Sequence, residues 1–304
     1  MWSLYVQVIS KFNDFRWEAL NQIEFFSIQN LIYWILMALL LILNWTLEAK
    51  KWHLLALKIE NISFIQAFKG VLVGLAFSNL FFSIGDFAGK ILMLQSNKRF
   101  QSIGAVLLGN SMQLYVSLLF GFIGLLSFVM TQNPSPKLIY NLLLFILGVC
   151  ILAGVLIGKY LPEFNQIKHT KNSFIAYLKV LGEFKPNEIY SIFILSFIRY
   201  LVFSSQFYLV FVIFQVKLPI YVLLSGIFLI FLGKTIGSLL NTLGDLSVRT
   251  LSATYFFSFY KVDIYMVYLA TFTVWLINVF VPILLGSIYL FQLKFSTPQL
   301  HKSK

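Results

Sequence analysis

Long uninterrupted apolar stretches constrain this chain more than any other feature of its sequence. They lie near residues 31–47, 67–84, 102–130, 138–157, 189–214, 220–240 and 265–290. Several reach the length of about 18 apolar residues that indicates a membrane-spanning helix. Charged residues make up only 11% of the chain, whereas about a quarter of the residues in a soluble domain are charged. The sequence therefore predicts an all-α, polytopic membrane protein.

Polar residues divide the chain into three predicted parts. Residues 1–30 mix charged and apolar side chains, such as Arg16 and Trp17, without the continuous apolar core of a cleaved signal peptide. We expect an amphipathic interfacial helix there, and a degenerate first span is the alternative. Residues 31–295 are predicted to form one integral membrane domain. Residues 296–304 are predicted to form a basic C-terminal tail.

A short motif occurs twice, and each copy follows an apolar stretch. Each copy reads Gly-Asp, three residues, then a cation, and the two copies are Gly85, Asp86 and Lys90, then Gly244, Asp245 and Arg249. Because the acid and the cation are four residues apart, they share one face of a helix and can pair. Ionisable residues are costly at membrane depth, so a repeated pair there is by default a hypothesis of a functional site.

We interpret both motifs as substrate-binding sites for a lipid headgroup. The cation would bind a phosphate, and the acid would bind an ammonium group or hold the cation in place. The glycines, Gly85 and Gly244, would let the backbone turn or approach a ligand closely. The alternative is an ordinary helix start, in which the glycine ends one helix and the aspartate caps the next.

Two further cations lie within apolar stretches. Arg199 is seven residues from Gln206, so both lie on one helix face. Arg199 either snorkels to the interface or has a buried partner, which would be Asp86, Asp245 or a lipid phosphate. Lys234 has the same alternatives, and we include both cations among the candidate substrate-binding residues. Glu48, which follows the first apolar stretch, is expected to pair with Lys51 or with the neighbours of Trp52 at the interface.

The sequence predicts no catalytic group, no cofactor and no metal site. The histidines His53, His169 and His301 do not have the spacing of metal ligands, and Cys150 is the only cysteine. No basic, aromatic-bearing soluble module is present, so we expect no nucleic-acid binding. The net charge of +12 is instead the kind of excess that anionic lipid headgroups attract.

The distribution of the cations predicts the topology. If the segments 67–84 and 220–240 enter the bilayer and return as re-entrant or broken helices, about five stretches cross it. Three crossings then separate the motifs, which gives an inverted repeat. One side would hold Lys11, Arg16, Lys137, Lys217, Arg249 and Lys261, and most of the 23 cations would lie on the other. By the positive-inside rule that side, with the C-terminus, is cytoplasmic. Full spanning of both segments is the alternative.

The chain from Asn44 to Leu126 resembles the transmembrane region of the lysylphosphatidylglycerol synthases, a flippase-like domain that also occurs as a standalone protein. The elements that carry this likeness are the aromatic and basic stretch 45–55, the residues 62–64 before a small-residue helix, the first motif, Arg199 with Gln206, and the second motif. The family usually has Glu and Arg where Asp86 and Lys90 stand, and an acid where Thr250 stands. The resemblance covers about residues 31–290.

The resemblance implies a lipid translocator in a bacterial-type cytoplasmic (inner) membrane, without the soluble domain that transfers the aminoacyl group. We therefore expect a non-enzymatic protein that moves a phospholipid or lipid-linked headgroup between leaflets. The alternative is a non-catalytic scaffold or accessory subunit of a lipid-modifying enzyme. The expected partners are membrane phospholipids or lipid-linked molecules, and the sequence leaves open a homo-oligomer or a membrane enzyme partner.

Overall fold

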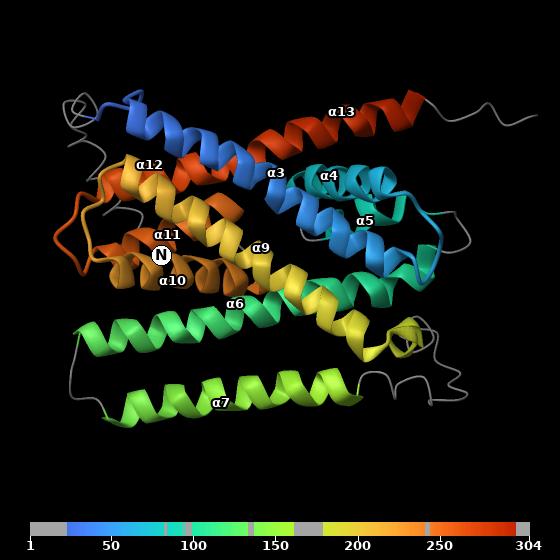
Figure 1. Ribbon diagram of the computed structural model, residues 1–304, viewed down its shortest axis with the longest axis horizontal. Coiled ribbons are helices and arrows are strands. Elements are labelled where there is room, and N and C mark those ends of the chain that lie inside the picture. Colours follow the sequence, from blue (N-terminus) through green and yellow to red (C-terminus); the bar gives the residue numbers. More distant parts are fainter. Residues whose placement is uncertain are drawn as a thin grey trace, which may run out of the picture.

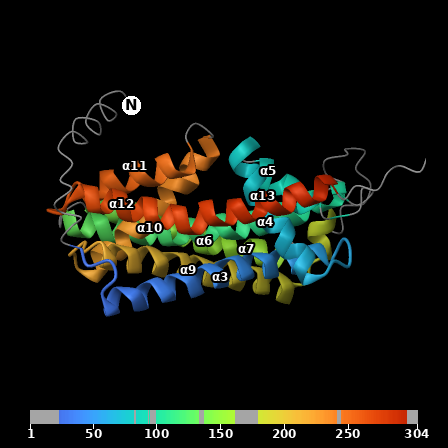
Figure 2. The ribbon, with the colours of Figure 1, turned by 90° about the horizontal axis from the view of Figure 1, so that it is seen from above.

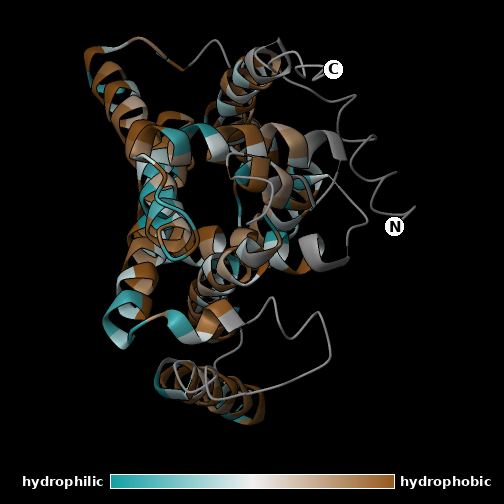
Figure 3. Ribbon diagram, turned by 90° about the vertical axis from the view of Figure 1, so that its right-hand side faces the viewer, coloured by the Kyte–Doolittle hydropathy of each residue, from teal (hydrophilic) through white to brown (hydrophobic). Residues whose placement is uncertain are grey.

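The computed structural model describes residues 23–81, 84–92, 94, 99–132, 137–160, 179–240 and 244–295. Most of the predicted N-terminal segment and all of the C-terminal tail 296–304 lie outside this part. The described residues form helices and no strand, so the prediction of an all-α protein is confirmed. Figure 3 views the molecule from the end where α4 and α5 lie, and its helices are mostly hydrophobic.

The helices follow the apolar stretches closely. They are α3 (Ile28–Ala56), α4 (Phe64–Phe81), α5 (Ile84–Leu92), α6 (Ser102–Gln132), α7 (Lys137–Tyr160), α9 (Pro186–Ile213), α10 (Ile220–Leu240), α11 (Asp245–Phe257), α12 (Ile264–Trp275) and α13 (Val281–Phe295). Short helical turns lie at Arg99–Gln101 and Lys179–Glu183, and a π-helical turn at Leu276–Phe280 joins α12 to α13. The last predicted span, 265–290, thus folds as one continuous helical rod that contains a π turn at Leu276–Phe280.

Six helical segments among the described residues are long and apolar enough to cross a membrane, as judged by length and composition. They are α3, α6, α7, α9, α10 and the continuous segment 264–291. The protein is therefore a multi-pass membrane protein. One of the six, α10, is a segment that we expected to be re-entrant, whereas the apolar part of α4, Phe64–Ser78, is shorter than a span.

The two motif-bearing segments fold as helical hairpins at opposite ends of the molecule (Figure 1). The hairpin of α4 and α5 lies at one end, and the hairpin of α10 and α11 lies at the other, whereas α3, α6, α7, α9 and the α12–α13 rod run along the length. Within each hairpin the two helices pack on each other. The number of full crossings and the return of each motif-bearing segment to its own side stay predictions, because α10 is itself long and apolar enough to span a membrane.

Contacts between the helices repeat from one half of the chain to the other. In the first half α4 packs on α13 of the second half, and in the second half α10 packs on α6 of the first half. Glycines permit the close approach in both places: Gly286 of α13 faces the backbone of Leu72, and Gly124 of α6 faces Phe228. Figure 2 shows α5 and α11 on the same face of the molecule. Each motif-bearing hairpin thus packs on a long helix from the other half of the chain.

Two hydrophobic cores divide the interior. One contains Met37 of α3, Val116 of α6 and the later part of α9 from Tyr200 onward. The other contains the part of α3 from Trp45 onward, and Met112 of α6. The core boundary therefore crosses α3, α6 and α9 at neighbouring levels, which is where polar side chains of these helices meet.

Adding a methyl group at Gly89 should loosen the first hairpin. A Cβ atom on Gly89 would overlap the backbone of Gly74 and Val73, whereas a Cβ atom on Gly148 of α7 would meet nothing within 4 Å. Overpacking of this kind costs about 1–3 kcal/mol, so Gly89→Ala should lower the thermal unfolding midpoint in detergent. Gly148→Ala is the matched control and should leave it unchanged or raise it, because alanine is the better helix former. Equal midpoints for the two variants would contradict the hairpin packing.

Candidate functional site

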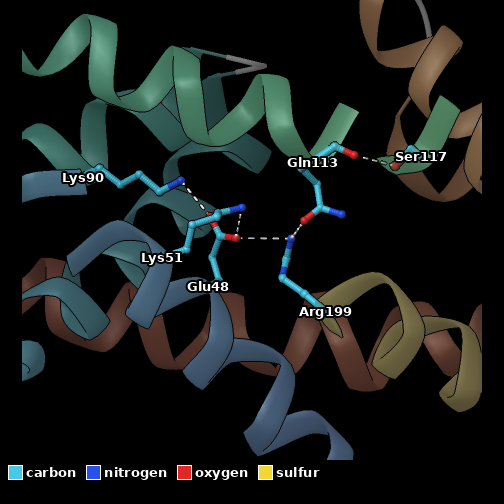
Figure 4. A network of polar contacts seen from close by, with 6 residues as sticks. All are labelled: Glu48, Lys51, Lys90, Gln113, Ser117 and Arg199. Carbon is cyan, nitrogen blue, oxygen red and sulfur yellow. Dashed lines mark hydrogen bonds and ion pairs between the residues drawn. The ribbon is translucent and has the colours of Figure 1, made fainter. Parts of the chain in front are cut away.

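The carboxylate of Glu48 is the centre of a buried ionic cluster (Figure 4). Its Oε2 atom lies 2.7 Å from Lys51 Nζ and 3.3 Å from Arg199 Nη1. Its Oε1 atom accepts a hydrogen bond from Lys90 Nζ at 3.1 Å. A single carboxylate therefore links α3, α5 and α9.

Three helices position these groups for reasons that the sequence makes clear. Glu48 and Lys51 lie three residues apart on α3, on the face that also carries Asn44, because residues three and four apart share a helix face. Lys90 lies in the last turn of α5, where a cation is favourable near the negative end of the helix dipole. Arg199 lies near the middle of α9, at the level where the two hydrophobic cores meet.

Three of the four charged side chains are almost completely removed from solvent, whereas 17% of the Arg199 side chain is exposed. The relative exposure is 5% for Glu48, 2% for Lys51 and 3% for Lys90. Burying an ion is costly unless it is paired and hydrogen-bonded. The four charged groups therefore depend on one another, and removing one of them would leave the others without compensation.

Arg199 makes two further contacts that fix its guanidinium. Its Nη1 atom donates to Gln113 Oε1 at 3.2 Å, and its Cζ atom lies 5.4 Å from the centre of the Trp45 ring, which is a cation–π arrangement. The backbone carbonyl of Gln113 accepts a hydrogen bond from Ser117 Oγ at 3.0 Å. The helix α6 thus supports the cluster from a third direction.

Positive charge is in excess at this site. Three cations face one carboxylate among the described side chains. The side chain of Asp86 lies outside the described part. The Asn44 amide, one turn before Glu48, is fully buried and has no hydrogen-bond partner for its oxygen or nitrogen among the described residues. The site is therefore polar, buried and cationic.

A second, smaller cluster lies in the opposite hairpin. Asp245 Oδ2 accepts from Arg249 Nε at 2.9 Å, and Asp245 Oδ1 lies 3.8 Å from Lys234 Nζ. The Arg249 guanidinium packs over the rings of Phe203 and Phe231 at 5.3 Å and 5.8 Å. The Asp245 side chain is a quarter exposed and that of Lys234 is 41% exposed, so this cluster is more open to solvent than the Glu48 cluster.

Several pairings expected from the sequence are present. The i,i+4 pair of Asp245 and Arg249 is confirmed, as is the pair of Glu48 and Lys51. Lys234 has an acidic neighbour in Asp245. The pairing of Asp86 with Lys90 falls outside the described side chains. Whether any of these residues binds a substrate stays a prediction.

The expected partner of Arg199 is corrected by the structure. Arg199 pairs with Glu48 and Gln113 rather than with Asp245, because α9 crosses α3 and α6 at the level of these two residues. Gln206, which was expected on the same helix face as Arg199, is fully buried. Its Nε2 atom donates a hydrogen bond to the Met37 carbonyl at 3.4 Å. Arg199 is thus a paired cation with 17% of its side chain exposed, and its partner is an acid that was not among the partners expected from the sequence.

Each motif lies at the start of a helix, but the expected capping by the aspartate is wrong at the second motif. Gly244 is the N-cap of α11, with Asp245 as its first residue, and Gly85 and Asp86 lie in the first turn of α5. The carboxylate of Asp245 pairs with the Arg249 side chain, and no side-chain cap is present at this helix start. In the second motif, therefore, the glycine is the residue that precedes the helix, and the aspartate orders a cation.

The sequence did not identify Lys51 and Gln113 as members of a site, and it placed the end of the first span near Leu47. The structure continues α3 to Ala56 and buries its polar face. The signal available in the sequence was the spacing of Asn44, Glu48 and Lys51, four and then three residues apart, which places all three on one inward face.

Metal chemistry has no support in the part of the chain that the structure describes. That part contains no group of three histidine, cysteine, aspartate or glutamate residues that could hold a metal ion. Cys150 is a free, half-buried thiol on α7. Comparison with known proteins adds nothing to this assignment: no family model, no curated protein and no solved structure matches the chain.

Proposed function

We propose that this protein moves a phospholipid or a lipid-linked headgroup between the leaflets of a bacterial-type cytoplasmic membrane. The observation that carries the proposal is the Glu48 cluster, which places three cations and one carboxylate inside an apolar helical protein. Charges at such depth are expensive and mark substrate pathways. A charged headgroup that crosses the membrane needs a polar binding site of this kind along its path.

The two hairpins support the same proposal. Their opposite orientation (Figure 1) is the geometry by which inverted-repeat transporters expose a central site to one side and then to the other. Each hairpin carries a cation paired with an acid, through Lys90 in α5 and Arg249 in α11. In this proposal the α4–α5 hairpin admits the headgroup from the cytoplasmic side, and the α10–α11 hairpin admits it from the other side.

The proposed orientation follows from charge. The end of the molecule that carries Lys58, Arg99 and Lys185 would be cytoplasmic, together with the C-terminus, by the positive-inside rule. The opposite end carries fewer cations, among them Lys217 and Lys261. The resemblance to the transmembrane region of the lysylphosphatidylglycerol synthases adds to the proposal, with a standalone domain in the role of translocator.

A transfer assay tests the proposed function. Purified protein reconstituted into vesicles that carry fluorescent phosphatidylglycerol in both leaflets should make the inner-leaflet probe accessible to an external quencher. The expected result is complete quenching, whereas protein-free vesicles and vesicles with an unrelated polytopic protein should quench by half. Half quenching with the reconstituted protein, after orientation and folding are verified, would contradict the proposal.

A scaffold for a lipid-modifying enzyme is the second candidate, and α7 is the observation that favours it. This helix packs mainly on α6 and makes a smaller contact with α9. No residue of its most apolar stretch, within Lys137–Ile157, is buried. Its outer face is therefore available to lipid, to a second copy of the chain or to another membrane protein. Co-purification of an enzyme in fixed stoichiometry, combined with absent lipid transfer, would favour this candidate.

A further inference from the structure

We infer that the Glu48 cluster is a binding site for the phosphate of an anionic headgroup, and that the Glu48 carboxylate occupies the place of that phosphate when the site is empty. The inference deepens the proposed function and rests on it for the source of the ligand, a lipid headgroup. It assigns Glu48, Lys51 and Gln113 to the site, in addition to the cations Lys90 and Arg199.

Charge is the first argument. Lys51, Lys90 and Arg199 converge on a single carboxylate within 3.3 Å, and two of these cations are almost fully buried. Among the described side chains, these three cations face one carboxylate, which compensates their charge poorly where two of them are buried. A phosphate monoanion or phosphodiester would supply the missing negative charge, whereas a cationic headgroup would be repelled.

The geometry of the donors is the second argument. The N–H groups of arginine and lysine bind carboxylate and phosphate oxygens in the same way, through short charge-assisted hydrogen bonds. Here they come from three different elements, since Lys51 belongs to α3, Lys90 to α5 and Arg199 to α9 (Figure 4). A carboxylate that bridges three elements is well placed to be exchanged for an anion with more oxygen acceptors.

The Asn44 amide is an independent observation that points to a ligand. Both of its polar atoms are buried and without a partner among the described residues, one turn from Glu48 and on the same face of α3. Buried polar groups normally have partners. The hydroxyl and phosphate oxygens of a polar headgroup would form hydrogen bonds with this amide. Free inorganic phosphate bound only at the cations would form fewer of them.

Removal of the Glu48 charge gives the sharpest test, because ligand binding and structural pairing predict opposite signs. The probes are short-chain phosphatidylglycerol below its micelle concentration, inorganic phosphate, and the matching diacylglycerol, which has no phosphate. Each is added to purified full-length protein in a nonionic detergent, and the thermal unfolding midpoint reports binding, since a ligand that binds the folded state stabilises it.

Glu48→Gln should unfold at a lower temperature than the unaltered protein when no ligand is present. It should bind phosphatidylglycerol about tenfold more tightly, because the competing carboxylate is gone, and the ligand should restore its midpoint. Arg199→Gln should bind about tenfold more weakly. The matched control is Glu188→Gln, which removes a carboxylate from the exposed pair with Lys58 at 2.8 Å and should leave the affinity unchanged.

The outcomes distinguish a lipid headgroup from free phosphate as the ligand. They also distinguish failure of the proposed phosphate site from failure of the proposed lipid transfer. Tighter binding of phosphatidylglycerol than of inorganic phosphate supports a lipid headgroup site, and equal binding of both overturns the lipid as its source. Stabilisation by diacylglycerol to the same degree overturns the phosphate site. If Glu48→Gln yields no folded protein, Glu48→Asp takes its place, since its shorter carboxylate should compete less well and still tighten binding. Unchanged affinity in the folded Glu48 variant and in Arg199→Gln overturns the inference even where vesicle transfer is active, so the two failures are distinguishable.

Discussion

Neutralising both motif aspartates, with Asp86→Asn and Asp245→Asn in one chain, should reduce lipid transfer in vesicles to the level of protein-free controls. Asp245 holds Arg249 at 2.9 Å and lies 3.8 Å from Lys234, so its charge fixes the cations of the α10–α11 hairpin. The motif repeat predicts the same role for Asp86 in the other hairpin. If each hairpin admits the headgroup from its own side, losing the ordered cation on both sides stops transfer in both directions.

The control for this double variant is Asp263→Asn. Asp263 is an exposed carboxylate that caps α12 by accepting from the backbone N–H of Tyr265 at 2.9 Å. Its loss should cost about 1 kcal/mol of stability or less, since asparagine is also a good N-cap residue, and it should leave transfer intact. If the folded double variant transfers lipid at the rate of the unaltered protein, the motifs are not part of the transport site.

Reversing the charge of Glu48 should have the largest effect on stability of any single substitution. Breaking a buried ion pair by removing one partner costs about 3–5 kcal/mol, and Glu48→Lys also adds a fourth cation beside Lys51, Lys90 and Arg199. Proteins are stable by only about 5–15 kcal/mol in total. We therefore expect little or no monodisperse protein in detergent, as measured by size-exclusion chromatography of the fluorescently tagged chain.

A charge exchange tests whether this loss is due to the cluster. Adding Arg199→Glu to Glu48→Lys restores an opposite-charge pair between α3 and α9, so it should recover part of the folded protein. The reference is the exposed pair, exchanged as Lys58→Glu with Glu188→Lys, in which each change should alter stability by about 1 kcal/mol or less. Normal yield and midpoint for Glu48→Lys alone would contradict the burial and the role of the cluster.

The positions of the helices could be predicted from the sequence because the apolar stretches are long and are separated by turn-forming residues. The stretch 220–240 was predicted with the bounds that α10 has, and the span from residue 102 was predicted within two residues of the end of α6. The end of α3 was placed too early, near Leu47, because Glu48 and Lys51 were taken to lie outside the membrane. In the structure their charges compensate one another inside the bundle, so the helix continues with a polar inward face.

The candidate site was only partly predictable for a physical reason. Pairs within one helix, such as Asp245 with Arg249, follow from the helical repeat alone. The contacts of Glu48 with Lys90 and Arg199 join residues 42 and 151 positions apart, and they depend on how α5 and α9 pack against α3. No local pattern reports that packing. Gln113 lies in an otherwise apolar helix and gains its role from the same crossing.

Side-specific thiol labelling tests the central claim, that the two hairpins enter from opposite sides and return, most directly. In a Cys150→Ser background, single cysteines replace Leu57 and Phe100, which flank the α4–α5 hairpin, and Lys217 and Lys261, which flank the α10–α11 hairpin; all four lie outside the long helices and are exposed. We predict that 57 and 100 react only from the cytoplasmic side, and that 217 and 261 react only from the other side. Labelling of 57 and 100 from opposite sides would make the first hairpin a full crossing and would contradict the account.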